Sequence, residues 1–428
     1  MEENDSLCLP AESHARLRAC CAQQAAQADQ KQWHSGTVAD HPKTSRKFMQ
    51  ITAIEPAWNG NTHLPANMGL LRILRHAYPD ADVTFVAGQD QIDALRKIAP
   101  QTMVDGLRFI AITPAHDKDT LYQDVSKRVA VLRELPANCT TRADLIVLCS
   151  CTATVIAAIN RIGLASKCMT FLHGNANDIS GWRSKNPFRR FFDFKGSIQS
   201  FCKKGGKLLV YEQRIKNNLA KLHPWLDKST HVIGHPLVEE ESPSPGTSKS
   251  LGNPIKIGFP GMATIAKGFP EFLALADSIQ RAAPGIYEFH SIGYLHDTCK
   301  DLDQSSLKTK PGKGLPRKEF IDSLLQMDFL FTWHNDNYYS NAASGVIYDA
   351  INLGIPVIAK RSALIDELNK PNNAIGLIFN TIEEAKINIL ASQAWVQDYP
   401  AMIKGISEIR KKHSTSNLAN TFSAIFKD

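Results

Sequence analysis

The sequence predicts an α/β protein made of two consecutive domains, each built on a parallel sheet, after a mobile N-terminal extension. Three observations support this class. Short, nearly continuous apolar runs alternate with amphipathic helical patterns, as they do in parallel sheets covered on both faces. The alternation occurs twice, on either side of a run rich in acidic residues, serine, proline and glycine. At 428 residues, the chain has room for two domains of ordinary size.

The first alternation follows a segment of different composition. Residues 1–46 are rich in alanine, glutamine, serine and histidine and poor in branched apolar residues. We therefore expect a mobile extension there, with a partner-binding helix as the alternative. The strands predicted after it are 48–54, 82–87, 107–112, 144–149, 168–172 and 208–211. The accompanying predicted helices are 65–76, 90–98, 117–135, 152–162 and 213–222.

The second alternation follows the linker-like run. Its predicted strands are 255–259, 287–292, 328–333, 356–359 and 376–379. Its predicted helices are 270–282, 317–326, 344–352, 381–394 and 399–411. These patterns divide the chain into an extension, a first domain, a linker, a second domain and a C-terminal helical segment, at residues 1–46, 47–238, 239–253, 254–395 and 396–428.

The unit from residue 328 to residue 368 indicates a binding site most directly. An apolar strand ends in the polar loop of residues 334–341, a helix begins near Ser344, and Gly354 suits the left-handed conformation that ends a helix. The loop thus lies at the carboxyl end of a parallel strand, where open α/β sheets bind ligands. Three loop residues are ligand candidates, with plain solvation as the alternative: His334, Asp336 and Tyr338.

The composition excludes several classes of protein. A hydrophobic fraction of 43% and a charged fraction of 21% are those of a soluble globular protein. The formal charge of +7 suits an anionic ligand but is far from a histone-like excess. The nine cysteines include no CxxC pair, so we expect reduced thiols, no metal site and a cytoplasmic location. We find no apolar run long enough to span a bilayer and no signal-peptide pattern at the first residues.

Two glycine-containing turns that open predicted helices could bind phosphate. One holds Gly60, and the other runs from Gly261 to Gly268 before the helix at residue 270. Backbone N–H groups and the positive end of a helix dipole favour an anion there, and Lys267 adds an ammonium group. Neither turn matches a known phosphate-binding motif, so ordinary turn glycines beside a surface lysine are the alternative.

Three further side chains lie at element ends that a ligand could reach. His173 ends a predicted strand, where it either contacts a ligand or is satisfied by the backbone at the edge of the core. Asp349 lies in the helix after the polar loop and either contacts a ligand or faces solvent. Ser344 is expected to cap the start of that helix.

Residues 182–207 interleave phenylalanines with arginines and lysines. Interfacial membrane helices have this composition, so a peripheral membrane contact is one expectation. In the alternative, the phenylalanines pack on the sheet and the basic residues face water. Nucleic-acid binding is not expected, because the segment carries no known reader motif.

Several of these stretches resemble the GT-B fold glycosyltransferases, and among them the retaining, glycogen-synthase-like group of the type that assembles bacterial polysaccharides. The resemblance rests on Gly261 to Gly268, on the strand end at residues 330–333 and on SGVIYDA…GIPVI from Ser344 to Ile358, while His173 resembles the family's first-domain histidine. It implies two Rossmann-like domains facing across a cleft. The donor nucleotide sugar would lie against the second domain, and the acceptor would bind mainly to the first.

The chain departs from the family pattern at two positions. Met262 stands where the family usually has an arginine, five residues before Lys267. Asn341 stands where the first of two acidic residues is usual, and Asp349 matches the second. The first acid of the family acts near the donor sugar, so Asn341 bears on which sugar is used.

The resemblance implies a glycosyltransferase that moves a sugar from a nucleotide-diphosphate sugar to a glycan or lipid-linked acceptor, in polysaccharide or cell-envelope glycan synthesis. It implies retention by front-face displacement, no metal, and no cofactor beyond the donor substrate. Lys267 would stabilise the leaving diphosphate, Asp349 would hold sugar or ribose hydroxyls, and His173 would contact the sugar. The donor-binding residues expected are Gly60, Gly261, Gly268, Asn341, Ser344 and Gly345.

Two alternatives remain open at this point. The first is a sugar-nucleotide epimerase of the same fold, and the second is a nucleotide-sugar-binding partner subunit. We expect the protein in the cytoplasm. If residues 182–207 contact the membrane, we expect it at the inner face of the cell membrane.

Overall fold

The computed structural model describes residues 48–114, 122–181, 185–186, 190, 193–239, 250–334, 339–370, 373–391 and 394–427. All contacts reported below lie within the compact unit Phe48–Asp428. The predicted extension, residues 240–249 of the predicted linker, and the loop residues Asp336 and Tyr338 lie outside the described residues.

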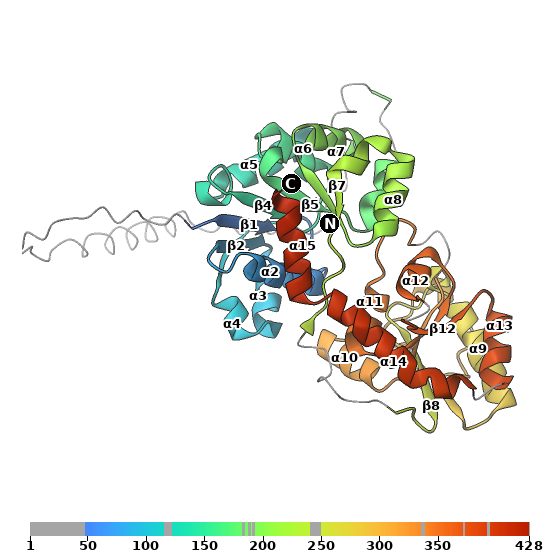
Figure 1. Ribbon diagram of the computed structural model, residues 1–428. Coiled ribbons are helices and arrows are strands. Elements are labelled where there is room, and N and C mark those ends of the chain that lie inside the picture. The colour runs from blue at the N-terminus through green and yellow to red at the C-terminus, as the bar shows by residue number, and fades with distance from the viewer. Residues whose placement is uncertain are drawn as a thin grey trace, which may run out of the picture. The chain divides into compact units, whose positions relative to one another are not determined.

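The first half of the described chain forms a parallel sheet of seven strands in the order β3-β2-β1-β4-β5-β6-β7 (Figure 1). The strands are β1 Gln50–Ile54, β2 Asp82–Ala87, β3 Leu107–Ala111, β4 Leu145–Leu148, β5 Cys168–Phe171, β6 Lys207–Val210 and β7 Thr230–Val232. The predicted strands are confirmed, with ends that differ by at most two residues. Strand β7 was not predicted, because it has only three residues and one buried side chain.

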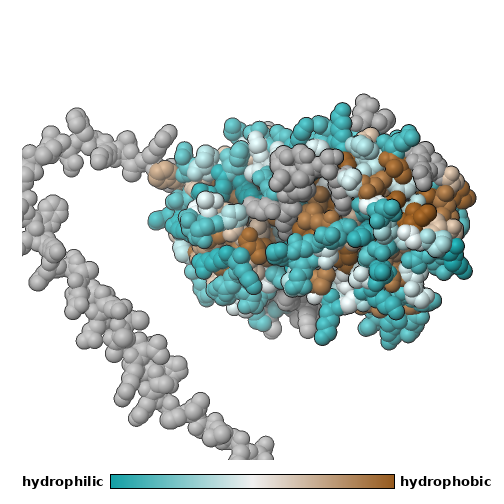
Figure 2. Space-filling view, turned by 90° about the horizontal axis from the view of Figure 1, so that it is seen from below, coloured by the Kyte–Doolittle hydropathy of each residue, from teal (hydrophilic) through white to brown (hydrophobic). Residues whose placement is uncertain are grey.

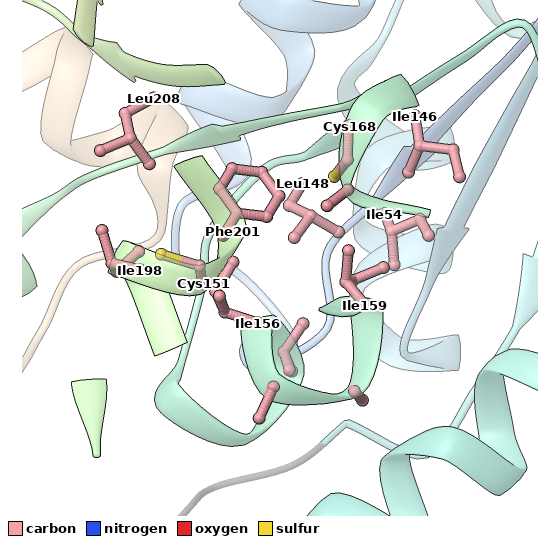
Figure 3. Close-up of a cluster of buried hydrophobic side chains, with 14 of the residues drawn as sticks. Ile54, Ile146, Leu148, Cys151, Ile156, Ile159, Cys168, Ile198, Phe201 and Leu208 are labelled. Carbon is pink, nitrogen blue, oxygen red and sulfur yellow. The ribbon is translucent and has the colours of Figure 1, made fainter. Parts of the chain in front are cut away.

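Two apolar clusters cover the two faces of this sheet. On one face pack α5 (Tyr122–Glu134), α6 (Ala153–Arg161) and α7 (Phe194–Lys203). On the other face pack α2 (Leu64–Ala77), α3 (Gln89–Ile98) and α15 (Thr415–Lys427). Figure 3 shows part of the first cluster, where side chains of α6 and α7 gather beside those of β4. The helix α8 (Gln213–Leu222) follows β6 and buries Ile215 and Leu219 in the same cluster.

The helix α15 returns from the end of the chain to the first sheet. Leu418, Phe422 and Ile425 are buried among the residues of the second cluster, and α15 packs beside α2 (Figure 1). This helix lies in the segment 396–428 that was expected to be helical, but its own bounds were not predicted, although the spacing of its apolar residues is that of an amphipathic helix.

The second half forms a parallel sheet of five strands in the order β12-β11-β10-β8-β9. The strands are β8 Ile255–Pro260, β9 Tyr287–Ile292, β10 Phe329–Thr332, β11 Val357–Lys360 and β12 Gly376–Phe379, and all were predicted. One face is covered by α9 (Phe269–Ala282) and α13 (Ile382–Ala391). The other is covered by α10 (Arg317–Leu325), α11 (Gly345–Leu353) and α12 (Ala363–Leu368), while α14 (Ala394–Lys412) contributes to both clusters. The short helix α12 was not predicted.

Each sheet has a topological switch point, where successive strands are added on opposite sides. In the first sheet it lies between β1 and β4, and in the second between β8 and β10. Ligands of open α/β sheets bind at the carboxyl ends of the strands beside such a point. Four connections are therefore placed to form sites: residues 55–63 and 149–152 in the first sheet, and residues 261–268 and the described residues 333–334 and 339–344 in the second.

The described part of the basic and aromatic segment is packed into the first sheet. Phe194 and Phe201 of α7 are buried in the core, and Asp193 caps α7 by accepting the Gly196 N–H at 2.7 Å. Packing of the phenylalanines on the sheet is thus confirmed for these two, while Phe188, Phe191 and Phe192 lie outside the described residues. No helix in the described part of the chain combines the length and apolarity needed to cross a membrane. On the face shown in Figure 2, polar residues surround the apolar patches.

Candidate functional site

Lys267 lies at the switch point of the second sheet. It ends the short 3-10 turn Ile265–Lys267, and its N–H donates to the Thr264 hydroxyl at 3.2 Å, which fixes the turn. Burial lowers the pKa of Lys267. Among the described residues, no carboxylate pairs with its ammonium group. A desolvated ammonium without a counter-ion is stabilised by an anionic ligand, so this position favours one.

The first turn of α11 borders the same spot as Lys267. Gly261 has a φ of +81°, which glycine adopts without strain. A Cβ added to it would lie 3.8 Å from Val346 Cγ2 and 3.9 Å from Lys267 Nζ. The N–H groups of Gly345 and Val346 donate to no acceptor among the described residues. The Lys267 ammonium group and a side chain of the first turn of α11, where the positive end of the helix dipole lies, therefore both lie close to Gly261.

Gly268 has a mainly structural role. Its φ is +81°, and an added Cβ would lie only 2.3 Å from the Trp333 carbonyl oxygen. The glycine thus lets the turn before α9 lie against the end of β10. The Phe269 N–H donates to the Thr264 carbonyl at 3.2 Å, and Pro270 has no N–H. The turn before α9 was expected to bind an anion through backbone N–H groups, but α9 offers fewer free N–H groups than that expectation requires. The N-terminus of α11 is the better source of free N–H groups.

Three buried oxygen atoms at this edge have no hydrogen-bond partner among the described residues. They are Thr332 Oγ1 at the end of β10, Asn341 Oδ1 in the polar loop and Ser344 Oγ before α11. Ser344 occupies the N-cap position, but its hydroxyl accepts no hydrogen bond from the helix, so the predicted capping role is wrong. Because an unsatisfied buried oxygen costs about 1–3 kcal/mol, ligand donors at this edge would be stabilising.

Asp349 is held by Arg317, a residue that sequence reasoning did not single out. Arg317 Nη2 lies 2.6 Å from Asp349 Oδ1, and Nη1 lies 3.2 Å from Oδ2. Both side chains are about one-fifth exposed, at 23% and 19%. Each carboxylate oxygen keeps a second lone pair for a ligand hydroxyl. A contact between Asp349 and a ligand therefore stays a prediction, with Arg317 as its fixed neighbour.

The polar loop before α11 is anchored to the first half of the chain by Arg214 of α8. The Arg214 guanidinium donates to the carbonyl oxygens of Tyr339, Ser340 and Ala342, at 2.5, 2.9 and 2.6 Å. It also pairs with the buried carboxylate of Glu212. Because a guanidinium is a rigid fork, these contacts fix the path of the loop.

Asn341 makes a second connection to the first half. Its Nδ2 donates to Asn177 Oδ1 at 2.8 Å. Asn177 belongs to the 3-10 helix Gly174–Ile179, which begins directly after His173. The residue that stands in place of the family's first acid thus contacts the segment that follows the predicted histidine.

A cavity of about 630 Å³ opens at the switch point of the first sheet. Its lining includes Trp58 and His63 from the connection after β1, Ser150 from the connection after β4, and His173 and Asp178 after β5. Three neighbouring strand ends thus contribute to one cavity. Gly60 lies in the first of these connections, with a φ of +60° and no atom within 4 Å of an added Cβ.

His173 is a neutral histidine in this cavity. Its Nε2 lies 2.7 Å from the Cys149 carbonyl oxygen, so Nε2 carries the proton and donates. Burial, followed by the charge of His63, lowers the pKa of His173 to about 4. The hydrogen bond from the ring to the backbone confirms one alternative from the sequence, and the position of the ring in the cavity lining leaves room for the other. The sugar contact predicted for His173 stays a prediction.

His63 and Glu55 were missed as functional candidates. The ring of His63 stacks on His173 with centroids 4.4 Å apart, and its Nδ1 lies 3.9 Å from Glu55 Oε2. Their sequence signal was the same as that of His173, since both are polar residues in a connection that follows an apolar strand. Among the described residues, no three histidine, cysteine or acidic side chains cluster closely enough to hold a metal ion.

The sequence matches no protein-family model and no curated protein. Solved structures match over nearly the whole chain. The glycosyltransferase of Rickettsia africae matches with a TM-score of 0.62 and 13% identity, over 89% of this chain and 98% of that chain. HepE of Anabaena, in complex with UDP and glucose, matches with a TM-score of 0.60 and 13% identity, over 89% and 99%.

A third match is a UDP-forming α,α-trehalose-phosphate synthase of Burkholderia vietnamiensis, with a TM-score of 0.58 and 9% identity over 89% of this chain and 98% of that chain. At such identities the likeness concerns the fold. Two parallel-sheet α/β domains of seven and five strands, each with its switch point, match these structures throughout. The chain has the GT-B fold.

Proposed function

We propose that this chain is a glycosyltransferase that moves a sugar from a nucleotide-diphosphate sugar to a hydroxyl of a glycan or lipid-linked acceptor. The observation that carries the proposal is Lys267, a partly buried ammonium without a carboxylate partner among the described residues, at the switch point of the second sheet. A diphosphate supplies the counter-charge that this position favours. Two of the structures of like fold carry UDP together with glucose or UDP-glucose, which supports the same class of donor here.

The chemistry proposed for the second-sheet site is stabilisation of the leaving group. When the bond from the sugar C1 to the diphosphate oxygen breaks, negative charge develops on that oxygen. Lys267 and the first turn of α11 both lie close to Gly261, and the N–H groups of Gly345 and Val346 have no acceptor among the described residues. Donors that are in place before the reaction need no reorganisation to meet the charge. Each such preorganised donor is worth about 100- to 1,000-fold in rate.

The hydroxyl groups of the donor would be held at the same edge. Asp349, kept in place by Arg317, has free lone pairs for a ribose or sugar hydroxyl. The oxygens of Asn341 and Ser344 have no hydrogen-bond partner among the described residues, so each can accept a hydrogen bond from a hydroxyl group of the donor. The family that the chain resembles usually has an acidic residue at this position. The Asn341 amide can still form hydrogen bonds with the sugar, but it brings no negative charge near it.

We propose that the acceptor binds in the cavity of the first sheet. An exposed Trp58 and the His173 ring give it apolar faces of the kind on which sugar rings stack. Retention and independence of metal ions are part of the proposal because the family resemblance implies them. The anomeric configuration of the product and a reaction in the presence of EDTA would test each separately.

The experiment is a donor screen with UDP-, GDP- and ADP-sugars, read by release of the nucleoside diphosphate and by product analysis. The wild-type chain is expected to bind at least one donor and to release its nucleotide. Lys267→Ala should lower kcat about 100-fold or more. The matched control is Lys318→Ala, which removes an exposed lysine whose partner is Asp322.

The outcomes separate the alternatives. Donor binding without turnover would favour a binding subunit, and an epimerised donor without added acceptor would favour an epimerase. If no donor in the panel binds, or if Lys267→Ala keeps full activity, the proposal is wrong.

A further inference from the structure

Asn341 lies at the edge of the second sheet that is proposed to hold the sugar donor, and it also contacts the first half of the chain. The residue is buried, at 5% exposure. Its Nδ2 donates to Asn177 Oδ1 at 2.8 Å, while its Oδ1 has no hydrogen-bond partner among the described residues. A carboxylate at this position could only accept hydrogen bonds. The amide can therefore accept from a ligand and donate to Asn177 at the same time, which the acid usual in the family cannot do.

The backbone on both sides of Asn341 is fixed. Arg214 of α8 donates to the carbonyl oxygens of Ser340 and Ala342, at 2.9 and 2.6 Å. Asn218 of the same helix donates from Nδ2 to the Ser340 carbonyl oxygen at 2.8 Å. Because both neighbours of Asn341 are held by hydrogen bonds, its side chain has a defined position at the sugar-donor edge.

Asn177 belongs to the 3-10 helix Gly174–Ile179 (the cavity turn), which follows β5. Three residues of the cavity turn line the cavity of the first sheet: Gly174, Asn175 and Asp178. Asn175 Nδ2 donates to the Cys151 carbonyl oxygen at 2.6 Å, which joins the turn to the connection after β4. Asn177 is exposed and accepts the hydrogen bond from Asn341. One hydrogen bond thus connects the sugar-donor edge to a turn that lines the proposed acceptor cavity.

The proposed reaction requires a fixed relation between these two places. In a front-face displacement, the acceptor oxygen approaches the sugar C1 from the side on which the diphosphate leaves. The acceptor therefore has to lie beside the leaving group with little freedom of position. Because a misplacement of about 1 Å can cost about 100-fold in rate, a contact that reaches both places has a direct effect on transfer.

We propose that Asn341 and Asn177 are positioning residues that couple the sugar-donor edge to the acceptor cavity. The inference rests on the proposed function, because the sugar donor is the ligand that acts on Asn341. A donor hydroxyl bound at Asn341 Oδ1 fixes the amide, the amide holds Asn177, and Asn177 holds the cavity turn in the conformation that binds the acceptor. Neither residue exchanges a proton with the reacting groups. The chain thus has a contact between its two sites where the family has a negative charge near the sugar.

The first experiment measures hydrogen exchange of the cavity turn, with the UDP-, GDP- or ADP-sugar that binds in the donor screen as the only ligand. The N–H groups of Ala176, Ser180 and Gly181 donate to carbonyl groups of residues 173–178, so their exchange measures the opening of the turn. In the wild-type chain the nucleotide sugar should slow this exchange about fivefold or more. Asn177→Ala and Asn341→Ala should both abolish the slowing. Asn177→Ala should leave the Kd of the nucleotide sugar within about threefold of wild type, because Asn177 does not touch the donor in the proposal.

The matched control is Asn218→Ala. It removes another hydrogen bond of 2.8 Å to the same loop, but from α8, which contributes no described residue to the lining of the cavity. The nucleotide sugar should still slow exchange of the cavity turn in this variant. Loss of the slowing in Asn218→Ala would show that any weakening of the loop has the same effect, and the specific role of Asn341 and Asn177 would be wrong.

Aspartate substitutions test the hydrogen bond itself at about pH 7.5, where aspartate is ordinarily ionised. Asn177→Asp leaves an acceptor for Asn341 Nδ2, and in Asn341→Asp the Asn177 amide can turn and donate. Each single variant therefore keeps one amide donor in the pair and should keep the slowing within about twofold of wild type. The double variant has two carboxylates and no donor, so it should lose the slowing. Equal slowing in the double and single variants would overturn the inference.

The second experiment compares transfer with hydrolysis of the same nucleotide sugar, using the acceptor on which product analysis finds the sugar. Asn177→Ala should lower kcat for transfer about tenfold or more, and leave the hydrolysis rate without acceptor within about threefold of wild type. Asn177→Asp should restore transfer. An equal fall of both rates, or a lower urea midpoint in Asn177→Ala, would indicate a structural role and contradict the inference.

The outcomes separate this inference from the proposed function. If no nucleotide sugar binds in the donor screen, the proposed function is wrong and the inference fails with it. If one binds but exchange of the cavity turn stays the same, or slows equally in Asn177→Ala, the inference alone is wrong.

Discussion

Arg317 and Asp349 form a two-point ion pair, with Nη2 2.6 Å from Oδ1 and Nη1 3.2 Å from Oδ2. The arginine begins α10 and the aspartate lies in the second turn of α11. The pair therefore joins two helices on the same face of the second sheet. The family resemblance assigns the Asp349 carboxylate to donor binding. The ion pair with Arg317 sets the directions in which this carboxylate can accept further hydrogen bonds.

Removing the arginine should weaken donor binding. In Arg317→Ala the Asp349 carboxylate loses both of its fixed donors and can rotate away from the ligand. We expect the donor Kd to rise about tenfold, and Arg317→Lys to recover only part of it, because an ammonium cannot replace the two-point contact. Titration calorimetry with the donor measures this effect.

The control for Arg317→Ala is Arg361→Ala, which breaks an ion pair between side chains that are half exposed, at 50% and 51%. That change should leave both the free energy of donor binding and the free energy of unfolding within about 0.5 kcal/mol of their wild-type values. An unchanged donor Kd in Arg317→Ala would show that Asp349 does not contact the donor.

Arg214 should matter more for stability than any exposed arginine. Its guanidinium satisfies three carbonyl groups of the polar loop and the buried carboxylate of Glu212. At about pH 8.5 Glu212 is ionised in the wild-type chain, because its pKa is about 7. Under these conditions Arg214→Ala leaves that carboxylate without its charged partner, so the free energy of unfolding should fall by about 3–5 kcal/mol. Urea unfolding measures the change.

A double variant separates the two contributions of Arg214. Arg214→Ala combined with Glu212→Gln removes the uncompensated charge, and the part of the loss that the second change recovers is the coupling between the pair. The remaining loss belongs to the loop. Equal losses in Arg214→Ala and in the double variant would mean that Glu212 is not charged in the folded state.

Much of the fold could be predicted from the sequence, because the strands are short apolar runs bounded by turn residues. The strand 82–87 and the helix 213–222 were placed to the residue. The short elements β7 and α12 have too few residues for a periodic pattern. Helix α15 does have one, but nothing in a local pattern says which sheet a terminal helix will cover.

The candidate site could be predicted only where it depends on local sequence. Lys267 and Ser344 stand out because they lie at turns before helices. Arg317 and Asp349 are 32 positions apart, so their pairing depends on the packing of α10 against α11. Glu55 and His63 meet because a turn folds the connection after β1 back on itself, and their relation to His173 depends on strand order. A side chain that acts through another is not visible until the sheet brings the strand ends together.

The pH dependence of stability should reflect three partly buried histidines whose rings lose water on folding. Burial lowers the pKa of His235 and His334 to about 3 and that of His173 to about 4. In the unfolded chain each has a pKa of about 6.5, so between about pH 6.5 and 4 the unfolded state binds more protons than the folded state. The free energy of unfolding should therefore fall as the pH falls through this window, and these groups should add no slope above about pH 7. Glu212, whose pKa burial raises to about 7, acts in the opposite direction over part of the same window.

One substitution isolates a single histidine. His235 stacks on Tyr348 with ring centroids 4.3 Å apart, and His235→Phe keeps a ring there that does not titrate. The slope of unfolding free energy against pH between pH 6 and 4 should decrease by up to about 1.4 kcal/mol per pH unit. His76→Gln, at an exposed position, should leave the slope as it is. Urea unfolding at pH 7.5, 6, 5 and 4 measures both slopes. An unchanged slope in His235→Phe would show that His235 becomes protonated in the folded chain.

At Gly345, an added methyl group should weaken donor binding without lowering the stability of the fold. It is the first residue of α11, its φ is not positive, and a Cβ added to it would meet no atom within 4 Å. Since alanine is the better helix former by up to about 1 kcal/mol, Gly345→Ala should unfold at the same or a slightly higher urea concentration. The new methyl group occupies space beside the free N–H groups of α11, so the donor KM should rise about fivefold or more if a diphosphate binds there.

Gly314→Ala, at an exposed glycine with equally open surroundings, should change neither the stability nor the donor KM. Gly268→Ala should instead destabilise the chain, because its Cβ would lie 2.3 Å from the Trp333 carbonyl oxygen. A wild-type donor KM in a stable Gly345→Ala variant would show that the diphosphate does not bind at the start of α11.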